Sequence, residues 1–181
     1  MLATIVEDWQ RRRELQAVNR RIAQEPEPAL PRFVAGHHRG PVWQLLVPGG
    51  PPAFMCLGYR EAFVVHVRAS AFHRAWLATG RALNQPCPRR DRFAQDRKFH
   101  WAISGFSQGI ENPVPLAEVT ATDWQGKRQI AFTNGITRTL WLLAHDVPAF
   151  PVQCWTEDEA VRVFEVAGLT PPIHVEELPK A

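Results

Sequence analysis

The residues best placed to carry out chemistry lie where an apolar segment, residues 129–133, meets a helical pattern. The connection is Asn134-Gly135, and Arg138 follows in the first turn of the expected helix. The start of a helix presents unpaired backbone N–H groups and a partial positive charge, and glycine lets an anion approach the backbone. Arginine there is unfavourable by roughly 0.3–1 kcal/mol unless a negative group lies opposite. The turn therefore predicts a site for an anion such as phosphate.

A plainer interpretation of the same turn stands beside this one. Asn-Gly pairs are common in ordinary turns. Arg138 would then be a surface arginine or one half of a salt bridge. The residues of the turn alone leave both interpretations open.

A second stretch, residues 89–101, interleaves cationic side chains with aromatic rings. Surfaces that follow a single nucleic-acid strand combine positive charge with rings on which bases stack. A solvated basic loop explains the stretch equally well. Trp101 and Trp124 flank the proposed site and are the rings expected to stack on a base. The predicted phosphate-contacting side chains are those of Arg89, Arg90, Arg92, Arg97 and Lys98, together with Trp101.

Length and composition predict one soluble domain. The 181 residues are 45% hydrophobic, enough for one core. The longest apolar runs, such as residues 62–67 and 140–144, are far shorter than the roughly 20 residues of a membrane span. Three separated cysteines (Cys56, Cys87, Cys154) form neither a disulfide framework nor a CxxC metal pair, and His37-His38 has no evident third ligand. We therefore expect a cytoplasmic protein with buried thiols.

The formal charge of +3 is distributed unevenly. Arginines are concentrated in residues 11–21 and again in residues 81–98, whereas the sequence after Trp155 is acidic. Positive patches attract nucleic acid, nucleotides and acidic protein surfaces through the same field. The distribution thus predicts an anionic partner without naming it.

Hydrophobic periodicity predicts an alternation of helices and strands. Residues 86–109 lack a period and are expected to be a long functional loop or irregular crossover. Ser70 is the expected N-cap of a helix that runs toward Leu83, and Gly168 is expected to end the last helix. The other expected elements are a helix over residues 5–23, a hairpin of 42–47 with 53–58, strands at 62–68, 129–133 and 149–155, and helices at 137–145 and 157–167.

The order of three segments resembles the boxes of the ParB/sulfiredoxin-like superfamily. Residues 114–119 read Val-Pro-Leu-Ala-Glu-Val, residues 132–139 carry the Asn-Gly turn and Arg138, and residues 147–152 contain Phe-Pro-Val. The resemblance implies the α/β (α+β) class, with a mixed sheet and flanking helices in one compact domain, residues 1–181. Within it we expect an N-terminal amphipathic helix (1–24), a motif-bearing core (112–155) and an acidic C-terminal helix and tail (156–181).

Departures from the superfamily pattern narrow the resemblance. Sulfiredoxins carry a reactive cysteine where this sequence has Ile136, so it is not a sulfiredoxin. ParB-like partition proteins carry a basic residue where this sequence has Thr137, and a helix-turn-helix domain for which the residues after Trp155 are too few. The sequence is most similar in type to the plasmid fertility-inhibition proteins of the Osa and FiwA kind.

That resemblance implies a protein that blocks transfer of DNA or effector proteins through a type IV secretion system, at its coupling ATPase. It implies ATPase and DNase activities with ATP and Mg²⁺ as cofactors, transferred or plasmid DNA as a partner, and a cytoplasmic location that reaches the inner membrane only through a partner. The implied catalytic residues are Arg138, Asn134, Thr137 and Glu118, and the implied phosphate-binding residues of the turn are Thr133, Gly135, Ile136 and Thr139.

The metal ligands stay undefined at this point. A phosphodiester-cleaving enzyme usually needs carboxylates for Mg²⁺. The candidates near the turn are Glu111, Glu118 and Asp123, and no spacing selects one. The alternative is a non-catalytic inhibitor that docks on the coupling ATPase or another transfer component.

Overall fold

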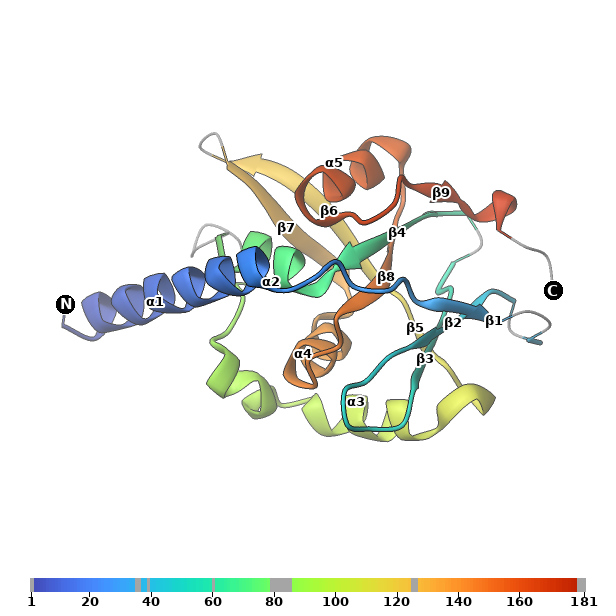
Figure 1. The fold of residues 1–181 in the computed structure, drawn as a ribbon, viewed down its shortest axis with the longest axis horizontal. Coiled ribbons are helices and arrows are strands. Elements are labelled where there is room, and N and C mark those ends of the chain that lie inside the picture. Colours follow the sequence, from blue (N-terminus) through green and yellow to red (C-terminus); the bar gives the residue numbers. More distant parts are fainter. Residues whose placement is uncertain are drawn as a thin grey trace.

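The computed structural model describes residues 2–34, 37–38, 40–59, 61–78, 86–124 and 127–178. Its strands form two sheets with helices packed around them (Figure 1). The helices are α1 (Leu2–Gln24), α2 (Ala69–Ala78), α3 (Phe99–Ser107), α4 (Ile136–Ala144) and α5 (Glu157–Ala167), with short 3₁₀ helices η1 (Arg90–Gln95), η2 (Gly109–Glu111) and η3 (Val175–Glu177). The strands are β1 (Arg32–Val34), β2 (Val42–Leu45), β3 (Ala53–Cys56), β4 (Phe63–Arg68), β5 (Val114–Pro115), β6 (Ala117–Trp124), β7 (Lys127–Asn134), β8 (Ala149–Cys154) and β9 (Ile173–His174).

The larger sheet has the strand order β7-β6-β8-β4-β9. Its central strand, β8, runs parallel to β6 and antiparallel to β4. Every residue of β8 is buried. A strand covered on both faces has a continuous apolar sequence instead of an alternating one. The apolar run at 149–155 predicted this strand correctly.

The smaller sheet has the order β1-β2-β3-β5. The predicted hairpin is confirmed, since β2 and β3 pair antiparallel from Val42↔Cys56 to Leu45↔Ala53. Leu116 lies between β5 in this sheet and β6 in the larger one, and its N–H donates to the carbonyl of Cys56 at 2.8 Å. The chain therefore passes from one sheet to the other within residues 115–117.

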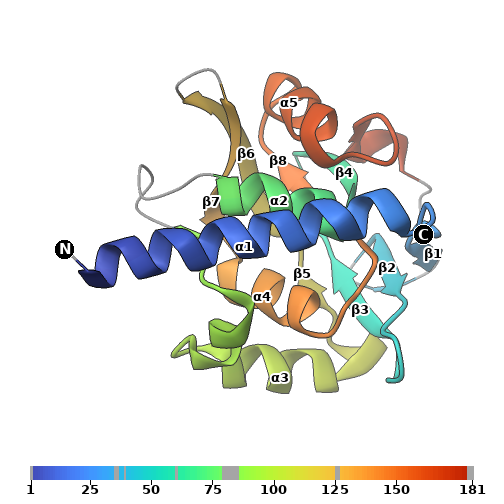
Figure 2. The same ribbon diagram turned by 60° about the vertical axis from the view of Figure 1, so that its left-hand side comes forward.

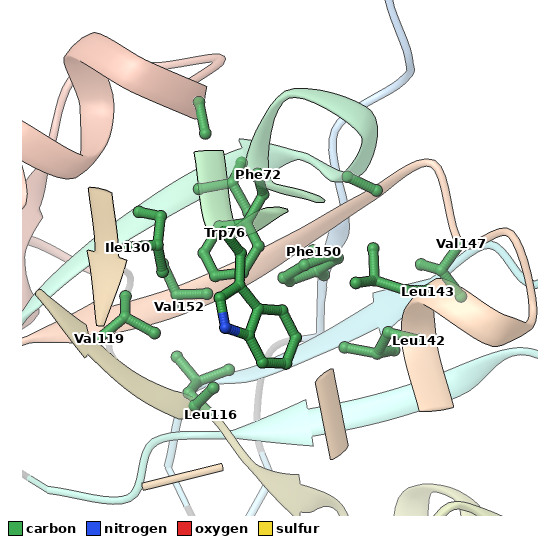
Figure 3. Close-up of a cluster of buried hydrophobic side chains, with 14 of the residues drawn as sticks. Phe72, Trp76, Leu116, Val119, Ile130, Leu142, Leu143, Val147, Phe150 and Val152 are labelled. Atoms are coloured by element: carbon green, nitrogen blue, oxygen red, sulfur yellow. The ribbon is translucent and has the colours of Figure 1, made fainter. Parts of the chain in front are cut away.

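One continuous core joins the sheets and helices (Figure 3). Phe72 and Trp76 of α2 are fully buried, and the ring of Phe72 lies edge-on to Phe150 of β8 at 5.5 Å. Leu142 of α4 reaches the same cluster. Full burial of each such side chain contributes about 1.5–3 kcal/mol. This core confirms the predicted α/β (α+β) class with a mixed sheet and flanking helices.

The predicted N-terminal helix is present and lies along α2, with its first turns projecting from the body (Figures 1 and 2). Its C-terminal end is fixed by Glu25, which accepts hydrogen bonds from Arg21 Nε and Arg68 Nε, each at 2.9 Å. Within the described part of the chain, no helix combines the length and apolar character needed to cross a membrane.

The expectation of an irregular segment at residues 86–109 is wrong for most of its length. Residues 90–95 form η1 and residues 99–107 form α3. The buried side chains of α3 are Phe99, Ala102 and Phe106, and Phe106 stacks on Trp141 of α4 at 4.1 Å. A helix of nine residues repeats its apolar spacing only two or three times. The arginines and prolines that precede α3 make so short a pattern hard to recognise in the sequence.

One predicted helix boundary also needs correction. Helix α2 begins at Ala69, directly after β4, and Ser70 lies inside it, where its hydroxyl donates to Glu25 instead of capping. Residues 79–83 of that predicted helix lie outside the described residues. Gly168 does end α5, but with φ −69° it is not left-handed. A Cβ there would lie 2.7 Å from the Cα of Phe164, so a close contact explains the glycine.

Candidate functional site

A groove of about 530 Å³ opens beside the Asn134-Gly135 turn. One wall is the turn and the start of α4, and the other is the connection from η1 into α3. The structure thus brings part of the basic stretch to the turn, although the two lie far apart in the sequence. The groove is lined by Asp96, Arg97, Lys98, Trp101, Ala102, Val114, Pro115, Phe132, Thr133, Asn134, Gly135, Ile136, Thr137 and Arg138.

Gly135 has a backbone role that the sequence did not reveal. Its φ is +99°, and a Cβ at this position would lie 2.7 Å from the Cα of Ala117. Both the left-handed conformation and the close approach to β6 therefore require glycine. The turn therefore packs against Ala117, at the place where the chain passes from the smaller sheet to the larger one.

The side chain of Arg138 donates hydrogen bonds to the backbone where the chain changes sheets. Its Nη1 donates to the carbonyls of Pro115 at 2.6 Å and Leu116 at 3.0 Å, and its Nη2 donates to Asn134 Oδ1 at 3.3 Å. These acceptors compensate for a cation in the first turn of a helix. Burial lowers the pKa of Arg138, while the nearby Glu118 carboxylate raises it. The guanidinium stays charged, as arginine does in proteins, and lines the groove.

Glu118 lies behind the turn and not in the groove lining. It is only 4% exposed and accepts a hydrogen bond from Asn134 Nδ2 at 3.2 Å. Asn134 therefore connects the carboxylate of Glu118 with the guanidinium of Arg138. The arrangement gives Glu118 a positioning role toward two of the groove residues.

Asp96 is the groove carboxylate that the sequence analysis missed. Its Oδ1 accepts hydrogen bonds from the hydroxyl of Thr137 and from the backbone N–H of Lys98, both at 3.0 Å. In the sequence Asp96 appeared only as a counter-charge within a basic stretch. Nothing in the spacing of Asp96 and Thr137 shows that they meet.

Trp101 and its neighbours form the outer part of the groove. Trp101 is 61% exposed, and Lys98 Nζ lies 5.5 Å from the centre of its ring. Arg97 and Lys98 are both exposed. An exposed ring beside two cations is suited to stacking on a base whose phosphate is neutralised nearby.

Several predicted site residues lie elsewhere. Arg89 and Arg90 face a different groove beside α1, and Arg92 lies near Pro86 and Leu77. Thr139 is fully buried and its hydroxyl donates to the carbonyl of Gly135 at 3.0 Å. Two of the candidate carboxylates also lie apart from the groove: Glu111 is exposed on η2, and Asp123 pairs with Arg128 at 3.0 Å. The side chain of Trp124 lies outside the described residues.

The described residues contain no group of three or more histidine, cysteine, aspartate or glutamate side chains arranged to hold a metal ion. His37 and His38 lie with their rings 4.3 Å apart, and all three cysteines are buried. Mg²⁺, however, keeps several waters and is commonly held by one or two carboxylates and the phosphates of a substrate. Asp96 with the nearby threonine hydroxyls fits a metal that arrives with phosphate.

Comparisons with known proteins agree with this architecture. The sequence profile of the family described as plasmid fertility inhibition factor matches residues 64–168. The chain is 42% identical over 151 residues to Protein osa of Shigella flexneri, covering 82% of this chain and 80% of that protein. A crystal structure of the Oncogenic Suppression Activity Protein, a plasmid fertility inhibition factor solved as a gold(I) cyanide derivative, superposes with a TM-score of 0.88 at 39% identity. That match covers 93% of this chain and 92% of the other.

The matched segment runs from β4 to the end of α5 and includes the whole turn and every residue that lines the groove. Profile, sequence and structure agree, and the chain belongs to the plasmid fertility inhibition factor family.

Proposed function

We propose that this protein inhibits transfer of DNA or effector proteins through a type IV secretion system by binding and cleaving phosphate esters in the groove beside Gly135. The observation that carries the proposal is the hydrogen bond between Thr137 and Asp96, which joins the two walls of a cationic groove. A carboxylate beside phosphate-binding cations is the minimum that metal-assisted hydrolysis requires.

Each groove residue has a proposed role that follows from its chemistry. Arg97 and Lys98 are exposed cations suited to phosphate oxygens, whereas Arg138 keeps the turn in place and adds positive charge to it. Asp96 would hold Mg²⁺, which supplies charge neutralisation and a more acidic bound water. Thr137 keeps one oxygen of Asp96 oriented by donating to it, and leaves the other oxygen available for the metal.

DNA is the proposed macromolecular substrate. Trp101 offers an exposed ring at the mouth of the groove, next to Lys98. This combination suits a single strand better than a duplex, because only unpaired bases present their faces. ATP is the second proposed substrate. The crystallised relative is named for oncogenic suppression, and we extend that activity to this chain as part of the proposal.

Nicking of supercoiled plasmid and ATP hydrolysis, each with Mg²⁺ and with EDTA, test the proposal. Asp96→Asn should lower both rates by at least about 100-fold if the carboxylate holds the metal. Glu111→Gln is the matched control, because it removes a carboxylate that is exposed outside the groove. Equal rates in the wild type and Asp96→Asn would refute the assignment.

The alternative is a non-catalytic inhibitor located in the cytoplasm and held near the inner membrane by the coupling ATPase. The observation in its favour is that the groove lining contains a single carboxylate, Asp96, among the described residues. Conjugation from a donor cell expressing Asp96→Asn separates the two functions. Full inhibition by a variant without nicking or ATPase activity would favour docking, and loss of inhibition together with both activities would favour catalysis.

A further inference from the structure

A second groove, of about 610 Å³, lies along α1 and is separate from the turn. Its lining residues come from α1, from α2, from η1 with the preceding Arg89, and from the end of α4 with the loop that follows. Its α1 residues extend from Trp9 to Arg21, which corresponds to roughly 18 Å along the helix axis. Neither the turn nor Asp96 contributes to its lining.

A buried imidazole at the floor of this groove lacks a hydrogen-bond partner. His73 is 4% exposed, and its Nε2 makes no hydrogen bond. Glu14 Oε1 lies 3.7 Å from this nitrogen, which is too long for a hydrogen bond. Leaving a buried polar atom unsatisfied costs stability, so such atoms in native proteins call for an explanation. A polar atom of a bound molecule would satisfy His73.

The rim of the groove is cationic. Arg13 lies over the ring of Trp9, with its guanidinium carbon 4.7 Å from the ring centre, and it has no ion pair with any described residue. Arg21 and Arg90 share one carboxylate, Asp146, at 2.7 and 2.8 Å. Four arginines and three carboxylates line the groove. Arg21 also pairs with Glu25 next to it, so Arg13 is the cation that an anion would meet.

The interior of the groove is apolar, and the ring of Trp9 adds a planar face to it. Small aliphatic side chains from α1 and α2 and from the end of α4 leave the space open, and the exposed ring of Trp9 extends it. Such a surface buries a planar apolar body better than a hydrated inorganic anion. The residues involved are Ala17, Val18, Ala69, Leu143 and Val147.

We propose that this groove binds a small anion with a planar apolar body, which places its charge beside Arg13 and a hydrogen-bonding atom beside His73 Nε2. Nucleotides and aromatic carboxylates or sulfonates share this chemistry. The proposal is independent of catalysis at the turn, because the two grooves have no lining residue in common.

The test uses anilinonaphthalene sulfonate as the probe, with its fluorescence titrated against the full-length protein. We expect one saturable site. Ala17→Trp should abolish it by filling the groove, and Arg13→Ala should weaken it by about 10-fold through loss of a charged partner. Arg12→Ala is the matched control, because it removes the same charge from an exposed position outside the groove. Circular dichroism confirms that each variant is folded.

Competition with ATP distinguishes a nucleotide from a non-nucleotide anion as the ligand of this groove. Displacement of the probe by ATP assigns a nucleotide to this groove, and saturable binding that ATP does not displace assigns a non-nucleotide anion. Unchanged probe affinity in folded Ala17→Trp and Arg13→Ala would overturn the proposal. Loss of probe binding in Arg138→Ala alone would also overturn it, since that result would place the probe at the turn.

Discussion

Thr137, in the first turn of α4, donates a hydrogen bond to Asp96, which lies 41 positions earlier in the chain. This contact joins the basic segment before α3 to the motif turn. Together with the packing of α3 and η1 on α4, it holds the wall of the groove that lies opposite the turn. The relationship explains why a segment without sequence periodicity contributes to the site.

Replacement of Gly135 by alanine should destabilise the fold by at least about 2 kcal/mol, because alanine is strained at a φ of +99° and its Cβ would overlap Ala117. Urea denaturation measures the difference. Gly109→Ala is the control, since Gly109 also has a positive φ of +62° but open space around it. That variant should lose only about 1 kcal/mol. Equal losses in the two variants would contradict the close contact with β6.

The sequence predicted most of the elements around this turn. Residues 149–155 form a continuous apolar run and residues 157–167 have helical periodicity, and in the structure Thr156 with Glu159 forms the capping box that begins α5. The turn itself was identified from Asn134-Gly135 and Arg138. These features are local, so a reading of neighbouring residues is enough to find them.

The composition of the groove depends on contacts that are not local. Asp96 is one of two aspartates among many cations, and only the packing of α3 on α4 brings it to Thr137. The same packing separates Arg97 and Lys98, which reach the turn, from Arg89 and Arg90, which face α1. The number of charges in this stretch could not show that its side chains contribute to two different surfaces.

Replacement of Arg138 should affect stability as well as activity. Arg138→Ala leaves the carbonyls of Pro115 and Leu116 without their donor, at a cost of about 2 kcal/mol. Arg138→Lys keeps the charge but cannot form the same fork, so it should recover part of the loss. Thermal or urea unfolding gives both values. Wild-type stability in Arg138→Ala would show that the arginine does not hold the sheet junction.

The three cysteines should be unreactive in the folded protein. Burial raises the pKa of Cys154 to about 12 and that of Cys87 well above its ordinary value, and thiolate is the reactive form. Cys56 is also buried. A chromogenic disulfide reagent at pH 8 should therefore label none of them natively and all three in urea. Rapid labelling of any thiol without denaturant would show that the corresponding region opens readily.

Stability should fall as the pH decreases below neutrality, and His73 should account for a large part of the change. Burial, with smaller contributions from Arg90 and Arg21, lowers the pKa of His73 to about 4. The unfolded chain, with a histidine pKa near 6.5, therefore binds an extra proton between about pH 6.5 and 4, and stability decreases through that window. Across this window, His73 alone should lower the free energy of unfolding by about 3 kcal/mol.

His73→Phe isolates this contribution, since it preserves a ring against Phe93 and removes the titration. The free energy of unfolding, measured in urea at pH 7 and at pH 4.5, should change less in the variant than in the wild type. His66, whose pKa is also lowered by burial, remains in both proteins and acts in the same direction. Glu14, with a pKa raised by burial, acts in the opposite direction, because its charged form is disfavoured in the folded state. An identical pH dependence in both proteins would mean that the pKa of His73 is the same in the folded and unfolded chain, which would contradict the effect of burial.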